Sequence, residues 1–83
     1  MAIMDTVMAT IQSILHDKLG VDEARITPTS TLDSLGADDL DIVEVFLEIE
    51  KEFNITIPDE EATFLVTKPL QSLVKYVASR TAR

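Results

Sequence analysis

Apolar residues recur with a helical period in three stretches of the chain, at about residues 3–19, 39–53 and 69–79. The segment 59–62 is acidic and follows a proline, which predicts the start of a short further helix before the last stretch. Strand-like alternation is confined to residues 54–57, which are too few to need a sheet. The pattern therefore predicts an all-α domain of three longer helices and one short helix.

Residues at the ends of these stretches suit helix caps. Asp38 fits the N-cap of the second helix, and Asp41 three residues later completes a capping box. Pro69 suits the first helical position of the last helix, and Gly20 fits the position that stops the first. The apolar arc of the first helix consists of Ile3, Val7, Ile11, Ile14, Leu15 and Leu19.

The connection between the first two long helices, residues 21–37, shows no sustained period. It is longer than most connections in compact domains, so it is either a functional loop or a loop held against the core. It contains Pro28, Gly36 and a cluster of serine and threonine residues. The apolar side chains expected to hold it are Val21, Ile26, Leu32 and Leu35.

Composition narrows the class of protein. The chain has 83 residues, 46% of them apolar, which predicts one domain over residues 1–83 with its own core. There is no cysteine, which excludes a disulfide framework, a thiolate metal site and a cysteine nucleophile, and makes the cytoplasm the simpler expected location.

Charge narrows the class of partner. The 15 acidic against 7 basic residues give a net charge of −8, which disfavours nucleic acid and anionic lipid surfaces and favours a basic protein partner. No run approaches the roughly 18 apolar residues of a membrane span, and the first residues lack the basic region of a signal peptide. We expect a monomer without stable membrane insertion.

The second helix carries a stripe of acids. At the helical period, four of its acids fall within about 80° of one another, with only Lys51 beside them. Like charges at this spacing cost a few tenths of a kcal/mol per pair, a cost that docking of a basic partner would offset. The stripe is therefore either an ordinary solvated face or a docking surface. Its members are Asp41, Glu44, Glu48 and Glu52.

The apolar side of the same helix is unusually wide. It covers roughly 200° of arc, where a surface helix needs a stripe of only about 100°. One interpretation, the default, is that the helix is flanked on two sides by other helices; the other, which is compatible with it, is that the helix walls an interior apolar slot. The residues concerned are Leu40, Ile42, Val43, Val45, Phe46, Leu47, Ile49 and Phe53.

The segment 35–41, Leu-Gly-Ala-Asp-Asp-Leu-Asp, resembles the signature around the carrier serine of acyl carrier proteins, whose core reads Gly-x-Asp-Ser-Leu-Asp. The pattern of that family also matches Val43, Glu44, Glu50, Phe53 and the segment 55–62. The resemblance covers nearly the whole chain. It implies a four-helix acyl-carrier-protein-like bundle with a long loop between its first two helices, serving fatty-acid or related acyl-chain synthesis in lipid metabolism.

The resemblance also implies site residues. Partner enzymes of the family dock through basic patches on the second helix, and the matching acidic positions here are Asp38, Asp41, Glu44 and Glu50. Lys51 stands where the family often has a further acid. The positions matching the acyl slot are Val43, Phe46, Leu47, Ile57 and Ala62, and the bulk of Phe46 is expected to shorten the slot.

Asp39 occupies the position of the carrier serine in this resemblance. In the family, the serine hydroxyl attacks coenzyme A and then carries 4′-phosphopantetheine as a phosphodiester. A carboxylate has no hydroxyl to form that ester, and attack through it would give a hydrolysable mixed anhydride. We therefore expect Asp39 to be unmodified and the chain to hold no cofactor. Ser34 lies five residues earlier, in the loop, where a role in the turn or in capping is expected.

Three explanations of Asp39 remain open. The chain is a natural paralogue without the arm, an engineered replacement of serine in an ordinary carrier, or a specialised carrier that binds cargo without a covalent link. The alternative function is a non-catalytic acidic helical interaction module that acts only through contacts with carrier-recognising enzymes.

Rival chemistry fits the sequence poorly. The acidic segment 33–44 has the length of an EF-hand loop, but Leu35 and Ala37 stand at ligand positions and the glycine is misplaced, so no metal site is expected. His16 is the single histidine, on the polar side of the first helix, and the chain has only two glycines and hence no glycine-rich phosphate loop. We do not expect an enzyme.

Overall fold

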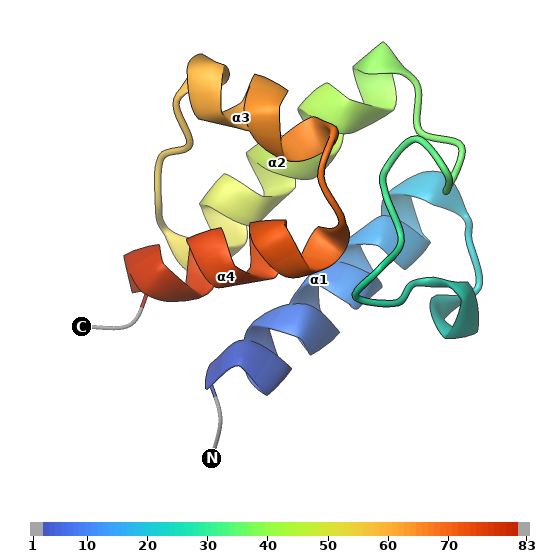
Figure 1. Cartoon of the computed structure of the whole chain (residues 1–83), viewed down its shortest axis with the longest axis horizontal. Coiled ribbons are helices and arrows are strands. Elements are labelled where there is room, and N and C mark those ends of the chain that lie inside the picture. Colours follow the sequence, from blue (N-terminus) through green and yellow to red (C-terminus); the bar gives the residue numbers. More distant parts are fainter. Residues whose placement is uncertain (1–2, 82–83) are drawn as a thin grey trace.

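The computed structural model describes the backbone of residues 3–81 and the side chains of residues 4–81. Over this part the chain forms α1 (Ile3–Leu19), a short 3₁₀ helix η1 (Glu23–Arg25), α2 (Asp39–Phe53), α3 (Asp59–Val66) and α4 (Leu70–Thr81), and no strand (Figure 1). The all-α prediction of three longer helices and one short one is confirmed. The expected inward position of the Ile3 side chain, and the expectations about Met1 and Ala2, lie outside the described residues.

Local capping explains the end of α1 and the start of α2, which lie where the sequence predicts them. α1 stops before Gly20, whose φ of 70° suits a residue without a Cβ. At the start of α2, the Asp41 N–H donates to the Asp38 carboxylate at 2.9 Å, and the Asp38 N–H donates to the Asp41 carboxylate at 3.2 Å. The predicted capping box is present.

The later helices differ slightly from the prediction. α3 continues to Val66, beyond the segment that predicted its start. α4 begins at Leu70, so the expectation that Pro69 is its first residue is wrong by one position. The Pro69 carbonyl accepts from the Ser72 N–H at 2.9 Å, which is the role of the residue that precedes the helix.

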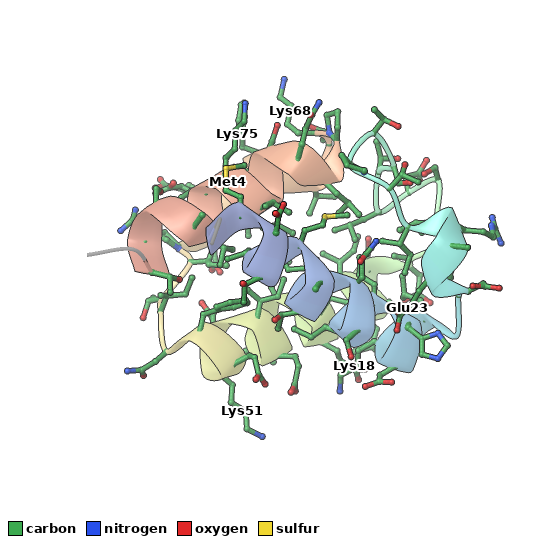
Figure 2. The ribbon with its side chains drawn as sticks, turned by 90° about the horizontal axis from the view of Figure 1, so that it is seen from below. Met4, Lys18, Glu23, Lys51, Lys68 and Lys75 are labelled. Atoms are coloured by element: carbon green, nitrogen blue, oxygen red, sulfur yellow. The ribbon has the colours of Figure 1, made fainter. Side chains whose placement is uncertain are left out.

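α1 is the element on which the core is built. It packs against both α2 and α4, and these two helices lie on either side of it (Figure 2). The predicted inward residues of α1 are buried at Val7, Ile11, Ile14 and Leu15 and half-buried at Leu19. The fully buried side chains of the described residues are all apolar.

The long loop is held against the body at both ends. Its four predicted apolar contacts, Val21, Ile26, Leu32 and Leu35, are all buried. The side-chain amide of Gln12 donates to the Ile26 carbonyl at 2.7 Å, and His16 Nδ1 lies 2.8 Å from the Val21 carbonyl.

The middle of the loop is tied to α4. The first two N–H groups of α4, those of Leu70 and Gln71, donate to the carbonyls of Ser30 and Pro28 at 2.8 and 2.9 Å. These bonds satisfy two otherwise free donors at the start of α4. The loop is therefore a pinned structural element, and it positions the start of α2.

Candidate functional site: α2 and its two grooves

Asp39 is the first residue of α2 and is exposed. Among the described residues its carboxylate has no hydrogen bond or ion pair. The free N–H groups and the dipole at a helix start favour a negative group there, by about 0.3–1 kcal/mol for a carboxylate. The site thus presents an unengaged negative charge at the tip of α2.

The hydroxyl of Ser34 is engaged within the loop. It donates to the Thr31 carbonyl at 2.8 Å and accepts from the Thr31 N–H at 3.0 Å. The Ser34 N–H in turn donates to the Thr31 hydroxyl at 3.0 Å. Both hydrogen-bonding capacities of the hydroxyl are used in the turn, as expected of a structural serine.

The acids at the start of α2 divide into bound and free groups. Asp38 and Asp41 bind each other's backbone in the capping box, so their carboxylates are partly committed to holding the helix start. Glu44, one turn further on, is exposed. Glu44 is therefore the most freely available of the predicted docking acids.

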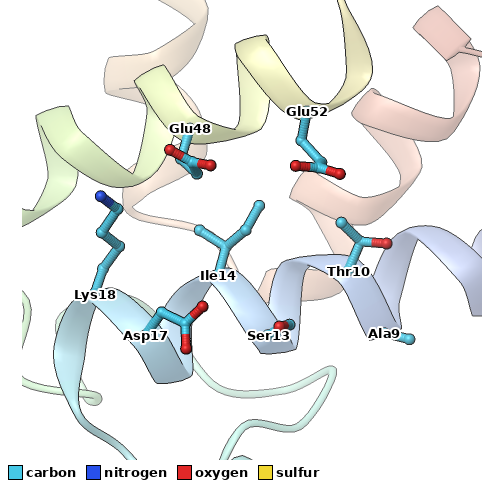
Figure 3. Close-up of a pocket in the computed structure, with 8 residues that line it drawn as sticks. All are labelled: Ala9, Thr10, Ser13, Ile14, Asp17, Lys18, Glu48 and Glu52. Carbon is cyan, nitrogen blue, oxygen red and sulfur yellow. The ribbon is translucent and has the colours of Figure 1, made fainter.

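Glu48 and Glu52 face α1 across a surface groove of about 540 Å³. Figure 3 shows both carboxylates directed toward Ile14 of α1, while Lys18 extends from α1 toward α2. Asp17 adds a third acid to the lining. The sequence interpretation missed this groove, although the helical spacing of the acid stripe already placed Glu48 and Glu52 together.

Glu50 lies apart from the acid stripe. It is half-buried, and its Oε2 accepts a hydrogen bond from the Ile57 N–H at 2.7 Å. The bond ties α2 to the segment that leads into α3. The resemblance assigned Glu50 to the docking surface, but in the structure one of its oxygens holds the backbone.

A second groove, of about 260 Å³, runs between α2 and α3. The five residues assigned to the acyl slot all line it: Val43, Phe46, Leu47, Ile57 and Ala62. Phe46 and Ile57 are buried at its base, while Val43 and Leu47 are exposed at its edge. The groove is thus open at the surface and is not the enclosed slot that was one interpretation of the wide apolar arc.

Three apolar side chains of α2 are exposed. Leu40, Val43 and Leu47 are 66%, 54% and 58% exposed, and their spacing places them on one stripe. α2 packs against α1 and shares a groove with α3, yet its wide apolar arc is covered only in part: its buried residues are Val45, Phe46 and Ile49. Contiguous exposed apolar side chains of this kind mark interaction surfaces.

α3, which forms one wall of the groove between α2 and α3, contacts α4 through a small polar cluster. Arg80 lies 3.5 Å from Glu61 and stacks 5.0 Å from the centroid of the Tyr76 ring. The Tyr76 hydroxyl is buried and makes no well-formed hydrogen bond. Burial raises the pKa of Tyr76, the Arg80 cation lowers it, and the Glu61 carboxylate raises it, with a net upward shift from 10.0.

Metal and membrane features are not seen in the part of the chain from residue 3 to residue 81. No group of three or more potential ligand side chains there is arranged to hold a metal ion, at the segment 33–44 or elsewhere. No helix in the same part is long and apolar enough to cross a bilayer.

Comparison with known proteins identifies the family to which the chain belongs. Residues 9–77 match the family model described as "Phosphopantetheine attachment site". The chain belongs to this family. It is 46% identical over 65 residues to the "Acyl carrier protein" of Karelsulcia muelleri (strain GWSS), an alignment covering 77% of this chain and 78% of that protein.

A second relative agrees. The chain is 42% identical over 74 residues to the "Acyl carrier protein" of Rubrobacter xylanophilus, covering 88% of this chain and 89% of that protein. Members of the acyl carrier protein family carry a group on 4′-phosphopantetheine for acyl-chain synthesis enzymes and do not themselves catalyse its conversion. The expectations of an acyl carrier protein fold and of a non-enzyme are confirmed.

Proposed function

We propose that this chain is an acyl-carrier-type protein of fatty-acid or related acyl-chain synthesis that meets carrier-recognising enzymes through α2 but holds no 4′-phosphopantetheine at residue 39. Its place in acyl-chain synthesis follows from membership of the acyl carrier protein family. The absence of the arm is our inference from the chemistry of residue 39. We further propose that it acts as a monomer in the cytoplasm.

The observation that carries the proposal is the side chain at the start of α2. Asp39 is exposed at the helix tip, where a phosphodiester would be well placed, but it offers a carboxylate and no hydroxyl. The nearest serine in the preceding turn, Ser34, has its hydroxyl committed to Thr31. The residues present therefore do not fit a covalently attached arm.

The remainder of α2 supports a role in protein contacts. The exposed carboxylate of Glu44 lies beside the exposed apolar stripe of Leu40, Val43 and Leu47. Such a surface suits an enzyme that presents basic side chains around an apolar patch, because charge sets the orientation and the apolar contact adds affinity. Contacts through these side chains do not require a 4′-phosphopantetheine arm on residue 39.

The test is intact mass spectrometry after incubation of the full chain with coenzyme A and a phosphopantetheinyl transferase. We expect no change in mass for the unaltered chain and a gain of about 340 Da, the mass of the arm, for Asp39→Ser. Asp39→Ala is the matched control and should stay unmodified. A stable adduct on the unaltered chain would overturn the proposal.

The position of the adduct is tested separately. In the Asp39→Ser background, Ser34→Ala should leave the gain in mass unchanged. Loss of the gain in that double variant would show that Ser34 is the acceptor. No gain in Asp39→Ser would show that residue 39 is not an attachment position of this chain, and either result contradicts our assignment.

A further inference from the structure

Charge is strongly segregated along the chain. Residues 1–61 hold all 15 acids and three of the seven basic residues. Residues 62–83 hold no acid and the other four basic residues, Lys68, Lys75, Arg80 and Arg83. α4 and the turn before it are therefore a basic segment in an acidic protein, and an acidic partner repelled elsewhere on the surface can approach there.

An apolar cleft of about 260 Å³ opens between the N-terminal halves of α1 and α4. Its apolar lining comes from Met4, Met8, Pro28 and Val74. Met4 is 39% exposed and Met8 is half-buried, so part of this lining is open to a partner. Methionine side chains are flexible and polarisable, which lets such a surface adapt to another apolar side chain.

One lysine borders this cleft. Lys75 lines it, and Lys68 belongs to the turn between α3 and α4. Both side chains extend outward on the same side of the molecule as Met4 (Figure 2). Lys68 also stacks 4.9 Å from the centroid of the Phe64 ring, which is itself 60% exposed. Asp5 is the single acid in the lining.

The cleft and the acid stripe of α2 are on opposite sides of the protein. In Figure 2, α4 lies along one edge and α2 along the other, with α1 between them. Lys18 and Lys51 are on the α2 side, where acids surround them, and Lys68 and Lys75 are on the α4 side (Figure 2). A partner bound at α2 therefore leaves the cleft accessible.

We propose that the cleft between α1 and α4 is a second docking surface, and that its occupant is an amphipathic helix of a partner protein whose apolar side chains are flanked by carboxylates. The apolar side chains enter between Met4, Met8 and Val74, and the carboxylates meet Lys75 and Lys68. With α2 engaged by a basic partner, the chain then joins two proteins of opposite surface charge. This surface does not involve residue 39, so the proposal of a second docking surface is tested independently of the proposal that residue 39 holds no arm.

Titration of the full ¹⁵N-labelled chain with a helix-stapled peptide is the direct test. The probe carries leucines at positions i, i+3 and i+7 and glutamates beside them, and the control probe has lysine in place of every glutamate. We expect the acidic probe to shift the amide signals of Met4, Met8, Val74 and Lys75, and to bind more weakly as salt increases. No shift, or shifts confined to α2, would overturn the proposal.

A pair of charge reversals makes the test specific. Lys68→Glu/Lys75→Glu should weaken binding of the acidic probe by about tenfold or more, because attraction becomes repulsion at the rim of the cleft. Lys18→Glu/Lys51→Glu makes the same change in charge on the α2 side and should leave binding within about twofold. An equal loss of affinity in both variants would show that binding depends only on the overall charge of the protein, which contradicts the assigned surface.

Two other occupants give distinct results. If a second copy of this chain fills the cleft, sedimentation will show a dimer that Lys68→Glu/Lys75→Glu dissociates. If an anionic membrane does so, vesicles of phosphatidylglycerol will bind the full chain with the same dependence on Lys68 and Lys75. Either result overturns the proposal of a partner helix.

Discussion

The carboxylate of Glu50 on α2 holds the backbone of Ile57, because its Oε2 accepts the Ile57 N–H at 2.7 Å. Ile57 is only 5% exposed and lies at the base of the groove between α2 and α3. One hydrogen bond thus fixes the segment before α3 against α2 and helps to set the width of the groove. An acid that the family resemblance assigns to docking has a structural task in this chain.

Removal of this acceptor should destabilise the fold. We expect Glu50→Ala to lower the free energy of unfolding by about 1–3 kcal/mol, because it leaves the Ile57 N–H without a partner in a half-buried place. Glu50→Gln keeps an acceptor oxygen and should lose less. Urea denaturation measures the differences.

The control for that change is Glu52→Ala, an exposed acid two residues further along α2. It should change the free energy of unfolding by no more than about 0.5 kcal/mol. Equal effects of Glu50→Ala and Glu52→Ala would show that the hydrogen bond to Ile57 contributes nothing specific.

The docking role of α2 is best tested at Glu44. Charge reversal at Asp41 would also break the capping box with Asp38, whereas Glu44 is exposed and does not cap the helix. We expect Glu44→Lys to weaken binding to a carrier-dependent enzyme about three- to tenfold at low salt, with the difference shrinking as salt increases.

The matched control is Glu23→Lys, an exposed acid of η1, the short turn that lies well away from α2 (Figure 1). Calorimetry or surface plasmon resonance on both variants gives the comparison. If Glu44→Lys binds as well as Glu23→Lys, α2 is not the surface that the enzyme recognises.

The high-pH titration of Tyr76 reports the contact between α3 and α4. Burial raises the pKa of Tyr76 above its ordinary 10.0, so folding favours the neutral phenol. Its contribution to stability is therefore fully present below pH 10 and is lost as the pH rises through the pKa of the folded state. Tyr76 is the only tyrosine and there is no tryptophan, so the absorbance of the phenolate follows this group alone.

Two variants separate the causes of that shift. Arg80→Ala removes the cation that lowers the pKa of Tyr76, so the midpoint should rise further. Glu61→Gln removes the carboxylate that raises it, so the midpoint should fall. A midpoint equal to that of the urea-unfolded chain would show that Tyr76 is solvated and that this cluster does not tie α3 to α4.

The acid stripe should make the protein salt-sensitive. At a net charge of −8 the acidic side chains repel one another, and Glu48 is spaced one turn from both Glu44 and Glu52. We expect the melting temperature to rise with salt, and Glu48→Gln to raise it at low salt by relieving a few tenths of a kcal/mol per pair. Differential scanning calorimetry across a salt series measures both effects, and a flat response of the unaltered chain would refute them.

The ends of α1 and α2 were predictable because they depend on near neighbours in the chain. The Asp38–Asp41 capping box and the left-handed Gly20 are local devices, and they appear where the sequence indicates. α4 is different: its first two N–H groups bind carbonyls of Ser30 and Pro28, residues about forty positions earlier. No local pattern contains that information, so the sequence placed the start of α4 within one residue but did not predict these two bonds.

The sequence by itself determined the all-α fold, the ends of the first two helices and the absence of a hydroxyl at residue 39, because period, capping and side-chain chemistry are properties of the chain alone. Tertiary structure decided which apolar residues stay exposed. It left Leu40 and Leu47 in solvent, and it turned Glu50 toward the Ile57 N–H. It also set the apolar cleft beside Lys75 on the side away from α2. The physical reason is that exposure and distant hydrogen bonds depend on how the helices pack against one another, and periodicity along one helix does not specify its neighbours.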